Sequence, residues 1–228
     1  MRSFPSIIIL TVIILTGSIL AAGCSPSPED PARGEGPGPE KELSGGASQT
    51  EEASLEDVPG TGAVSAEAVN IDGEIGEAEY MSSFEDKTTG MEVFWSNDSR
   101  YLYMGITTGS AGWVSVGFDP QTAMKGADMV FLAHDGSQII ARDDFGTSTF
   151  GHDSDIDLGG SLDIREYAGM KNINGAVYEF IIPLDSGDEF DKKLSPGNSY
   201  EVILAVHHSS IDFDTKHSAR SSGEITLY

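Results

Sequence analysis

The stretch GWVSVGFDPQTAMKGADMVFLAH, residues 112–134, decides the fold of this chain. It reads as a strand of small and aromatic residues, a loop that carries Met124, and a second strand that begins with Asp128. Methionine usually fills gaps inside a core, so a methionine in a loop between two buried strands has little reason to be there for packing alone. Met124 is therefore a candidate ligand.

The segments on both sides of this stretch repeat with a period of two. Apolar residues alternate over Met91–Ser96 and Val177–Ile182, and Val202–Val206 is a continuous apolar run, as in half-buried and fully buried strands. Further strands are expected at 101–107, 113–118, 128–133, 138–143, 162–167 and 223–227. Turn signals separate them, and we find no convincing amphipathic helix. The pattern predicts an all-β, antiparallel, immunoglobulin-like β-sandwich.

The N-terminal segment is typical of an exported lipoprotein. Its apolar run, Ile7–Leu20, is shorter than the roughly 20 residues of a membrane-spanning helix and is followed by Leu20-Ala21-Ala22-Gly23-Cys24, which resembles a lipobox. We expect residues 1–23 to be a signal peptide and Cys24 to carry a lipid. The alternative is an uncleaved anchor helix. Both place the protein outside the cytoplasm, and the lipid on Cys24 would tie it to the cell membrane or the outer membrane.

Composition divides the rest of the chain in two. Residues 24–67 are rich in Pro, Gly, Ser and Glu, and such a segment buries too little apolar surface to fold, so we expect a disordered acidic tether. Residues 68–228 are expected to form one domain. The chain has 37 acidic and 13 basic residues and a net charge of −24, which argues against nucleic acid as a partner.

Neither zinc-ligand spacing, nor a phosphate-binding loop, nor a nucleophile elbow occurs in the sequence. Cys24 is the single cysteine, which rules out an intramolecular disulfide. His207 and His208 follow one another in an expected strand and would point to opposite faces. His217 lies in a polar loop before the last strand; by itself it is interpreted as a solvated histidine.

Residues 112–134 resemble the DOMON family, β-sandwich domains that bind haem b or sugars. Gly112-Trp113, Met124 and Ala127-Asp128 correspond to the family's Gly-Trp strand, Met-containing loop and Ala-Asp strand. The closing segments are similar too: a strand ending in paired histidines, EVILAVHHSS, a loop with His217, a turn of small residues, and the strand EITLY. The resemblance spans the whole expected domain.

This resemblance implies a cofactor site. In haem-binding relatives the loop methionine and the late histidine are the axial ligands of a b-type haem, and the matching residues here are Met124 and His217. Three of the 13 basic residues, Lys125, Lys216 and Arg220, flank these positions, where the haem propionates would need cationic partners. A preference of basic residues for exposed loops explains the same placement.

A haem with both axial positions filled leaves no site for oxygen or substrate. The resemblance therefore implies an electron carrier and not an enzyme, with a separate redox protein as its partner. The alternatives are a carbohydrate or small-ligand binding module without haem, whose partner would be a glycan, and a purely structural surface domain. A sugar module would expose an aromatic platform, whereas Trp95 and Trp113 lie in alternating strands and are expected in the core.

A second site is implied by two aspartates. Asp128 and Asp163 match residues that hold a cation, such as Ca²⁺, in some relatives, and Asp143 and Asp144 lie between them in sequence. Carboxylates that converge without a cation would repel one another. The alternative interpretation is that these are solvated charges at strand ends, which are common in so acidic a chain.

Overall fold

The computed structural model describes residues 69–228. The expected signal peptide, the lipidation site Cys24 and the expected tether, residues 24–67, lie outside the described residues. Among residues 69–228, no helix is long and apolar enough to cross a membrane.

The described chain consists of β-strands with one short helix. In chain order these are β1 (Ser82–Asp86), β2 (Met91–Asn97), β3 (Tyr101–Thr108), β4 (Val114–Phe118), β5 (Asp128–His134), β6 (Ile139–Ser148), β7 (Gly151–Ser154), α1 (Asp155–Leu158), β8 (Glu166–Asn172), β9 (Gly175–Pro183), β10 (Ser199–Val206) and β11 (Ala219–Thr226). The expected strands correspond to nine of these, and β1 and β7 are additional.

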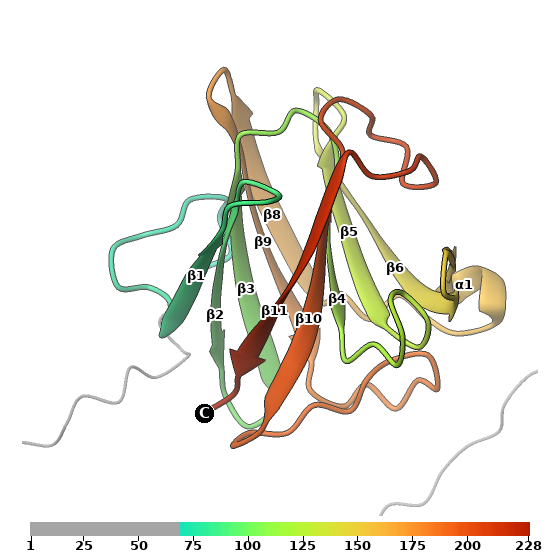
Figure 1. Ribbon diagram of the computed structural model, residues 1–228. Helices are drawn as coiled ribbons and strands as arrows, with labels where there is room; N and C mark the ends of the chain where they lie inside the picture. Colours follow the sequence, from blue (N-terminus) through green and yellow to red (C-terminus); the bar gives the residue numbers. More distant parts are fainter. Residues whose placement is uncertain (1–68) are drawn as a thin grey trace, which may run out of the picture. The chain divides into compact units, whose positions relative to one another are not determined.

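The strands form two sheets that face each other (Figure 1). The five-stranded sheet has the order β1-β2-β3-β9-β8, and the six-stranded sheet has the order β11-β10-β4-β5-β6-β7. Every neighbouring pair is antiparallel. The predicted all-β antiparallel sandwich is confirmed.

The main core lies between the sheets and follows from the period of two. Alternate residues of each strand point inward, and the largest fully buried side chains include Tyr178, Phe118 and Phe180. Trp95 also belongs to this core, with 7% of its surface exposed. Burying such side chains removes apolar surface from water, which is the main driving force for closing the two sheets.

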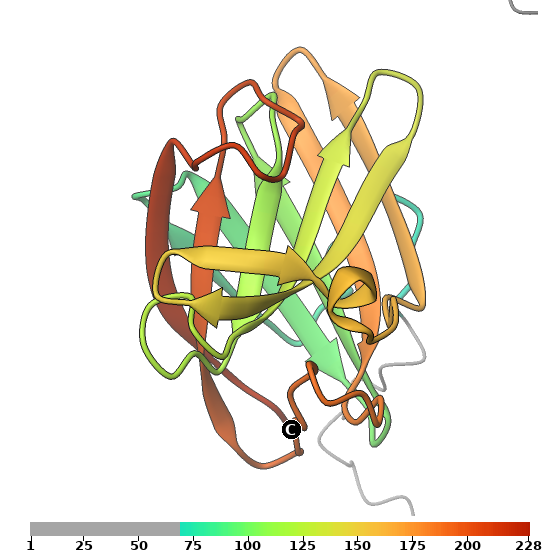
Figure 2. The same ribbon diagram turned by 90° about the vertical axis from the view of Figure 1, so that its right-hand side faces the viewer.

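The central strands of the six-stranded sheet are apolar on both faces. Val130 and Leu132 of β5 point into the main core, whereas Met129 and Phe131 belong to a second buried cluster on the outer face. Trp113 lies in this outer cluster and is 2% exposed, so both tryptophans are buried as expected. A second apolar face needs a cover, and here loops and the β6–β7 hairpin lie across it (Figure 2).

The outer face of the five-stranded sheet is covered by the segment that precedes β1. Glu179 of β9 is fully buried there and accepts hydrogen bonds from the amides of Asp72 (3.1 Å) and Gly73 (2.7 Å) and from the Tyr80 hydroxyl (2.7 Å). Gly105 of β3 leaves room for this segment, since a Cβ at that position would lie 2.9 Å from Ile75 Cδ1. The chain fills this outer face itself.

Two expectations about local structure were wrong. The strand expected at 162–167 begins only at Glu166, because residues 161–163 instead bond to side chains: the Ser161 amide donates to Asp188 and the Asp163 amide donates to Asp143. The paired histidines do not lie within a strand. β10 ends at Val206, and His207 Nδ1 accepts hydrogen bonds from the next two serine amides, which turns the chain.

Candidate functional site

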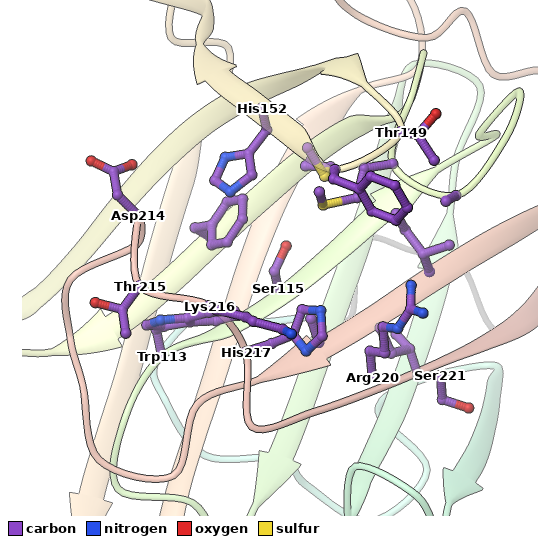
Figure 3. Close-up of a pocket in the computed structure, with 18 residues that line it drawn as sticks. Trp113, Ser115, Thr149, His152, Asp214, Thr215, Lys216, His217, Arg220 and Ser221 are labelled. Carbon is purple, nitrogen blue, oxygen red and sulfur yellow. The ribbon is translucent and has the colours of Figure 1, made fainter.

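A pocket of about 470 Å³ lies on the outer face of the six-stranded sheet. Strands β4, β5 and β10 supply its floor, and the β4–β5 loop, the β6–β7 hairpin and the β10–β11 loop supply its walls (Figure 3). Its volume falls in the range of sites for small molecules and cofactors. The lining residues are Trp113, Ser115, Ala123, Met124, Met129, Phe131, Thr149, Phe150, His152, Ile203, Leu204, Ala205, Asp214, Thr215, Lys216, His217, Arg220 and Ser221.

The floor of the pocket alternates small and large side chains. Ser115 and Ala205 are paired across β4 and β10, and their short side chains leave the space that forms the cavity. Trp113 and Phe131 contact each other edge to face, with ring centroids 5.3 Å apart. The Trp113 Nε1–H is buried, and among the described residues it has no hydrogen-bond partner. It is a donor without an acceptor among the described residues, in the floor of the pocket.

The β4–β5 loop brings Met124 to the pocket. Met124 is half-buried against the outer apolar cluster. The loop is joined to β6 by hydrogen bonds from the Gly126 amide to the Gly146 carbonyl (2.7 Å) and from the Gly146 amide to the Ala127 carbonyl (2.8 Å). A Cβ on Gly146 would lie 1.7 Å from the Met124 carbonyl oxygen. Glycine at 146 therefore permits the close approach that positions the methionine.

The β10–β11 loop brings His217 to the same pocket. The hydrogen bond from the Ser218 amide to the Val206 carbonyl (2.8 Å) closes this loop beside the end of β10. Burial, and then the charges of Arg220 and Lys216, lower the pKa of His217 below its usual value. The imidazole is therefore neutral at neutral pH, which is the form that can ligate a metal.

Of the three predicted basic residues, two line the pocket. Lys216 and Arg220 lie beside His217 along one edge of the pocket (Figure 3). Lys125 follows Met124 in the loop and is exposed, but it is not part of the lining. The structure thus brings Met124 to the same pocket as Lys216, His217 and Arg220, which lie far from it in the sequence.

Sequence reasoning missed a second histidine in the pocket. His152 of β7 is stacked on Phe131, with centroids 4.8 Å apart, and its Nδ1 lies 2.5 Å from Asp144 Oδ2. Asp144 is fully buried and also accepts two hydrogen bonds from Arg142, which reaches Asp214 in the β10–β11 loop. A carboxylate accepts hydrogen bonds, so Nδ1 is the His152 nitrogen that donates to Asp144.

The predicted acidic pair is separated from the pocket by the sheet. Asp128 belongs to a compact group with Asp143 and Asp191, whose carboxylate oxygens lie within 4.8 Å of one another. Asp163 is not in that group; its amide donates to Asp143 and its carboxylate accepts from Ser161. Asp191 carried no signal in the sequence, because it lies in the long loop between β9 and β10.

Several known proteins are similar to this chain in sequence or in structure. The sequence profile of the DOMON domain matches residues 87–207, and curated protein sequences gave no significant match. The cytochrome b domain of pyranose dehydrogenase from Coprinopsis cinerea is 13% identical, with a TM-score of 0.49, covering 63% of this chain and 80% of that one.

Two further solved structures are similar. The cytochrome domain of Myriococcum thermophilum cellobiose dehydrogenase is 9% identical, with a TM-score of 0.45, covering 64% of this chain and 88% of that one. A family 9 carbohydrate-binding module from Caldicellulosiruptor kristjanssonii, in complex with glucose, is 14% identical, with a TM-score of 0.39, covering 70% of this chain and 91% of that one. The profile match covers more than half of the 228-residue sequence. This chain belongs to the DOMON domain family.

Proposed function

We propose that the pocket on the six-stranded sheet binds a b-type haem and that the protein carries electrons without being an enzyme. The observation that carries this proposal is the convergence of Met124 and His217, from loops at opposite ends of the strands, on one pocket with an apolar floor. A thioether and an imidazole are a known ligand pair for haem iron, and they give a raised reduction potential.

The residues of the pocket fit such a group. His217 would supply a neutral ring nitrogen and Met124 a thioether sulfur. The apolar floor, with Trp113, Met129 and Phe131, would exclude water from the bound group. Lys216 and Arg220 would neutralise two propionates, as cations pair with carboxylates. Held by these two side chains, a b-type haem would exchange single electrons and would offer no open position to a substrate.

The remainder of the proposal concerns location. We place the domain outside the cytoplasm, attached by a lipid on Cys24 to the cell membrane or outer membrane, with residues 24–67 as a tether. Electrons would then pass to or from a separate redox protein. A chain with 37 acidic and 13 basic residues suits a partner with a basic docking face, because opposite charges steer association.

A sugar or small-ligand module without haem is the second candidate. Two observations favour it: the unpaired Trp113 Nε1–H in the pocket floor, and Phe150 at the pocket, which is 83% exposed. An indole donor suits a ligand oxygen, and an exposed aromatic ring suits the apolar face of a sugar.

The absorption spectrum of the full-length protein, expressed with ample haem, tests the proposal. We expect a Soret band that shifts on reduction. His217→Ala should lose most of the haem, because b-type haem has no covalent bond to the protein and a thioether is a weak ligand. Met124→His should keep haem and have a lower midpoint potential. The control is His208→Ala, since His208 is exposed outside the pocket and bonds to Ser110.

A colourless wild-type protein that binds glycans would overturn the haem proposal in favour of the second candidate. An unchanged spectrum in both pocket variants would show that haem binds elsewhere. Loss of haem in His208→Ala to the same extent as in His217→Ala would show a general effect of the substitution on folding.

A further inference from the structure

One charged side chain joins the pocket wall that carries His217 to a buried carboxylate of the sheet. Arg142 of β6 donates hydrogen bonds to Asp144 from Nε (2.6 Å) and from Nη2 (2.8 Å), and Nη2 also donates to Asp214 (2.8 Å). Asp144 is fully buried, whereas the side chain of Asp214, in the β10–β11 loop, is 74% exposed. Arg142 is not among the residues that line the pocket. It therefore acts on this wall from outside the pocket.

Aromatic rings hold the Arg142 guanidinium group in place. Its carbon atom lies 5.8 Å from the ring centroid of Phe131 and 5.3 Å from that of Phe213, and the two rings are tilted against each other with centroids 5.5 Å apart. Phe213 belongs to the β10–β11 loop and is 8% exposed. A planar guanidinium group stacks on aromatic faces and bonds to a carboxylate through two nitrogens, which a lysine ammonium group does not reproduce. Arg142 thus contacts the loop at two consecutive residues, Phe213 and Asp214.

The tip of this loop, residues 211–217, has a single polar connection to the rest of the described chain. Among residues 69–228, the Arg142–Asp214 pair is the one hydrogen bond or salt bridge that the loop tip makes outside the segment 207–218. The hydrogen bond and the charge of Arg142 lower the pKa of Asp214 below its usual value, so the pair is charged at neutral pH. The placement of the loop tip on the sheet therefore depends on this pair and on Phe213.

We propose that Arg142 is a positioning residue for His217. The inference rests on the proposed function, in which His217 is an axial ligand of haem iron. Asp214 precedes His217 by three residues, and both side chains lie at the pocket (Figure 3). A metal ligand on a loop needs partners that fix its position, and a partner that is itself locked by the protein loses little freedom in the contact. Arg142 meets that condition through its two bonds to Asp144.

The same buried carboxylate also holds the other histidine of the pocket. Asp144 accepts hydrogen bonds from His152 Nδ1 as well as from Arg142, so the β6–β7 hairpin and the loop tip are both connected to β6 through Asp144. Because Asp144 keeps both of these donors when Asp214 is changed, a variant at Asp214 should loosen the loop tip alone. Hydrogen exchange in β7 should stay as in the wild type and serves as an internal reference.

Amide hydrogen exchange of the full-length, haem-free protein tests the docking of the loop tip, and the spectrum of the haem-loaded protein tests its effect on His217. Asp214→Asn removes the charge that Arg142 binds. The amides of Thr215 and Ser218, which bond to nearby carbonyls, should exchange about two- to fivefold faster, as expected for the loss of an exposed ion pair. With haem, the ferric form should have a larger high-spin fraction, and haem loss to excess apomyoglobin should be faster by a similar factor.

A second variant addresses Arg142 itself. Alanine at this position would leave Asp144 buried with His152 as its remaining side-chain partner, and removing one member of a buried ion pair is costly to folding. Arg142→Lys keeps a positive charge beside Asp144 but lacks the fork that reaches two carboxylates at once. It should accelerate exchange of the two loop amides at least as much as Asp214→Asn does, with the same change of spin state.

The matched control is Asp212→Asn, which removes an exposed charge from the same loop tip and keeps an oxygen that can accept from the Asp214 amide. Its exchange rates and its spectrum should equal those of the wild type. An equal effect in Asp212→Asn and Asp214→Asn would assign the change to the net charge of the loop and would overturn the proposal.

Two other outcomes would also overturn it. Unchanged exchange in Asp214→Asn would show that the ion pair does not dock the loop tip. Faster exchange with an unchanged spin state and an unchanged rate of haem loss would show that docking does not place His217. A wild-type protein that takes up no haem would refute the proposed function instead, while the exchange rates of the haem-free protein would still decide whether Arg142 docks the loop tip.

Discussion

The outer faces of the two sheets are closed in different ways. On the five-stranded sheet, residues 70–80 cover the strands, and the one buried charge there, Glu179, has three hydrogen-bond donors. On the six-stranded sheet, the cover is incomplete and leaves a pocket of about 470 Å³ whose floor is apolar. An apolar face that the chain does not fill is costly unless something else fills it. Under the proposed function, the face with the pocket serves a ligand and the face covered by residues 70–80 serves stability.

Introducing a phenylalanine on the outer face of each sheet should give the largest difference in the free energy of unfolding. Gly105→Phe would drive the ring into Ile75 and Tyr80, and we expect a loss of about 3 kcal/mol or more in the free energy of unfolding. Ala205→Phe places the ring in the pocket and should cost less than about 1 kcal/mol while blocking ligand binding. Urea unfolding measures both values. Equal losses would mean that the two faces are equally well packed.

Removing one of the donors that bond to Glu179 should reduce the free energy of unfolding by a moderate amount. Tyr80→Phe deletes the hydroxyl that donates to the buried carboxylate, and a hydrogen bond to a charged group contributes about 1.5–3 kcal/mol. Hydrogen exchange in residues 70–80 should accelerate as their cover loosens. In the control, Tyr103→Phe, the lost bond goes to the part-buried Asp98, so the destabilisation should be smaller. A Tyr80→Phe protein as stable as the wild type would show that apolar contacts alone hold the segment.

The smallest effect should be the change with pH in the stability that Glu179 contributes. Burial raises its pKa, although its donors oppose this. The folded state therefore holds the proton of Glu179 more tightly than the unfolded state does. The resulting contribution to the free energy of unfolding is fully present below the unfolded pKa and is lost as the pH rises through the folded pKa. The free energy of unfolding of the wild type minus that of Glu179→Gln should fall as pH rises from about 4.5. A difference that rises with pH would show that the three donors outweigh burial.

Much of the fold could be predicted because alternation dominates it. The strands around residues 91–118 and 175–206 carry large apolar side chains at every second position, and turn residues separate them. β7 could not be predicted: its residues, Gly151–Ser154, are mostly polar, and it pairs with β6 through an irregular register. The short helix α1 has four residues and no amphipathic pattern to detect.

The pocket was only partly predictable, because most of its contacts arise only when the strands pair. Met124 and His217 stand in loops and were identified through resemblance to a family. Lys125 was chosen by proximity in sequence, which does not determine whether a side chain faces the pocket. His152 could not be found, because its role depends on Asp144, whose contact with it arises only when β6 and β7 pair. Asp191 likewise comes close to Asp128 and Asp143 only through the fold.

The backbone conformation beside Met124 affects how much the loop must rearrange when a ligand binds. Ala123 has a φ of 52°, in the left-handed region that costs a non-glycine residue about 1 kcal/mol or more. A loop that keeps this conformation is held by its surroundings and does not sample many alternatives. A ligand arriving at Met124 would then lose little entropy in ordering the loop. Under the proposed function, a sulfur held in this way would move little when the charge of the iron changes, which would keep the reorganisation energy small.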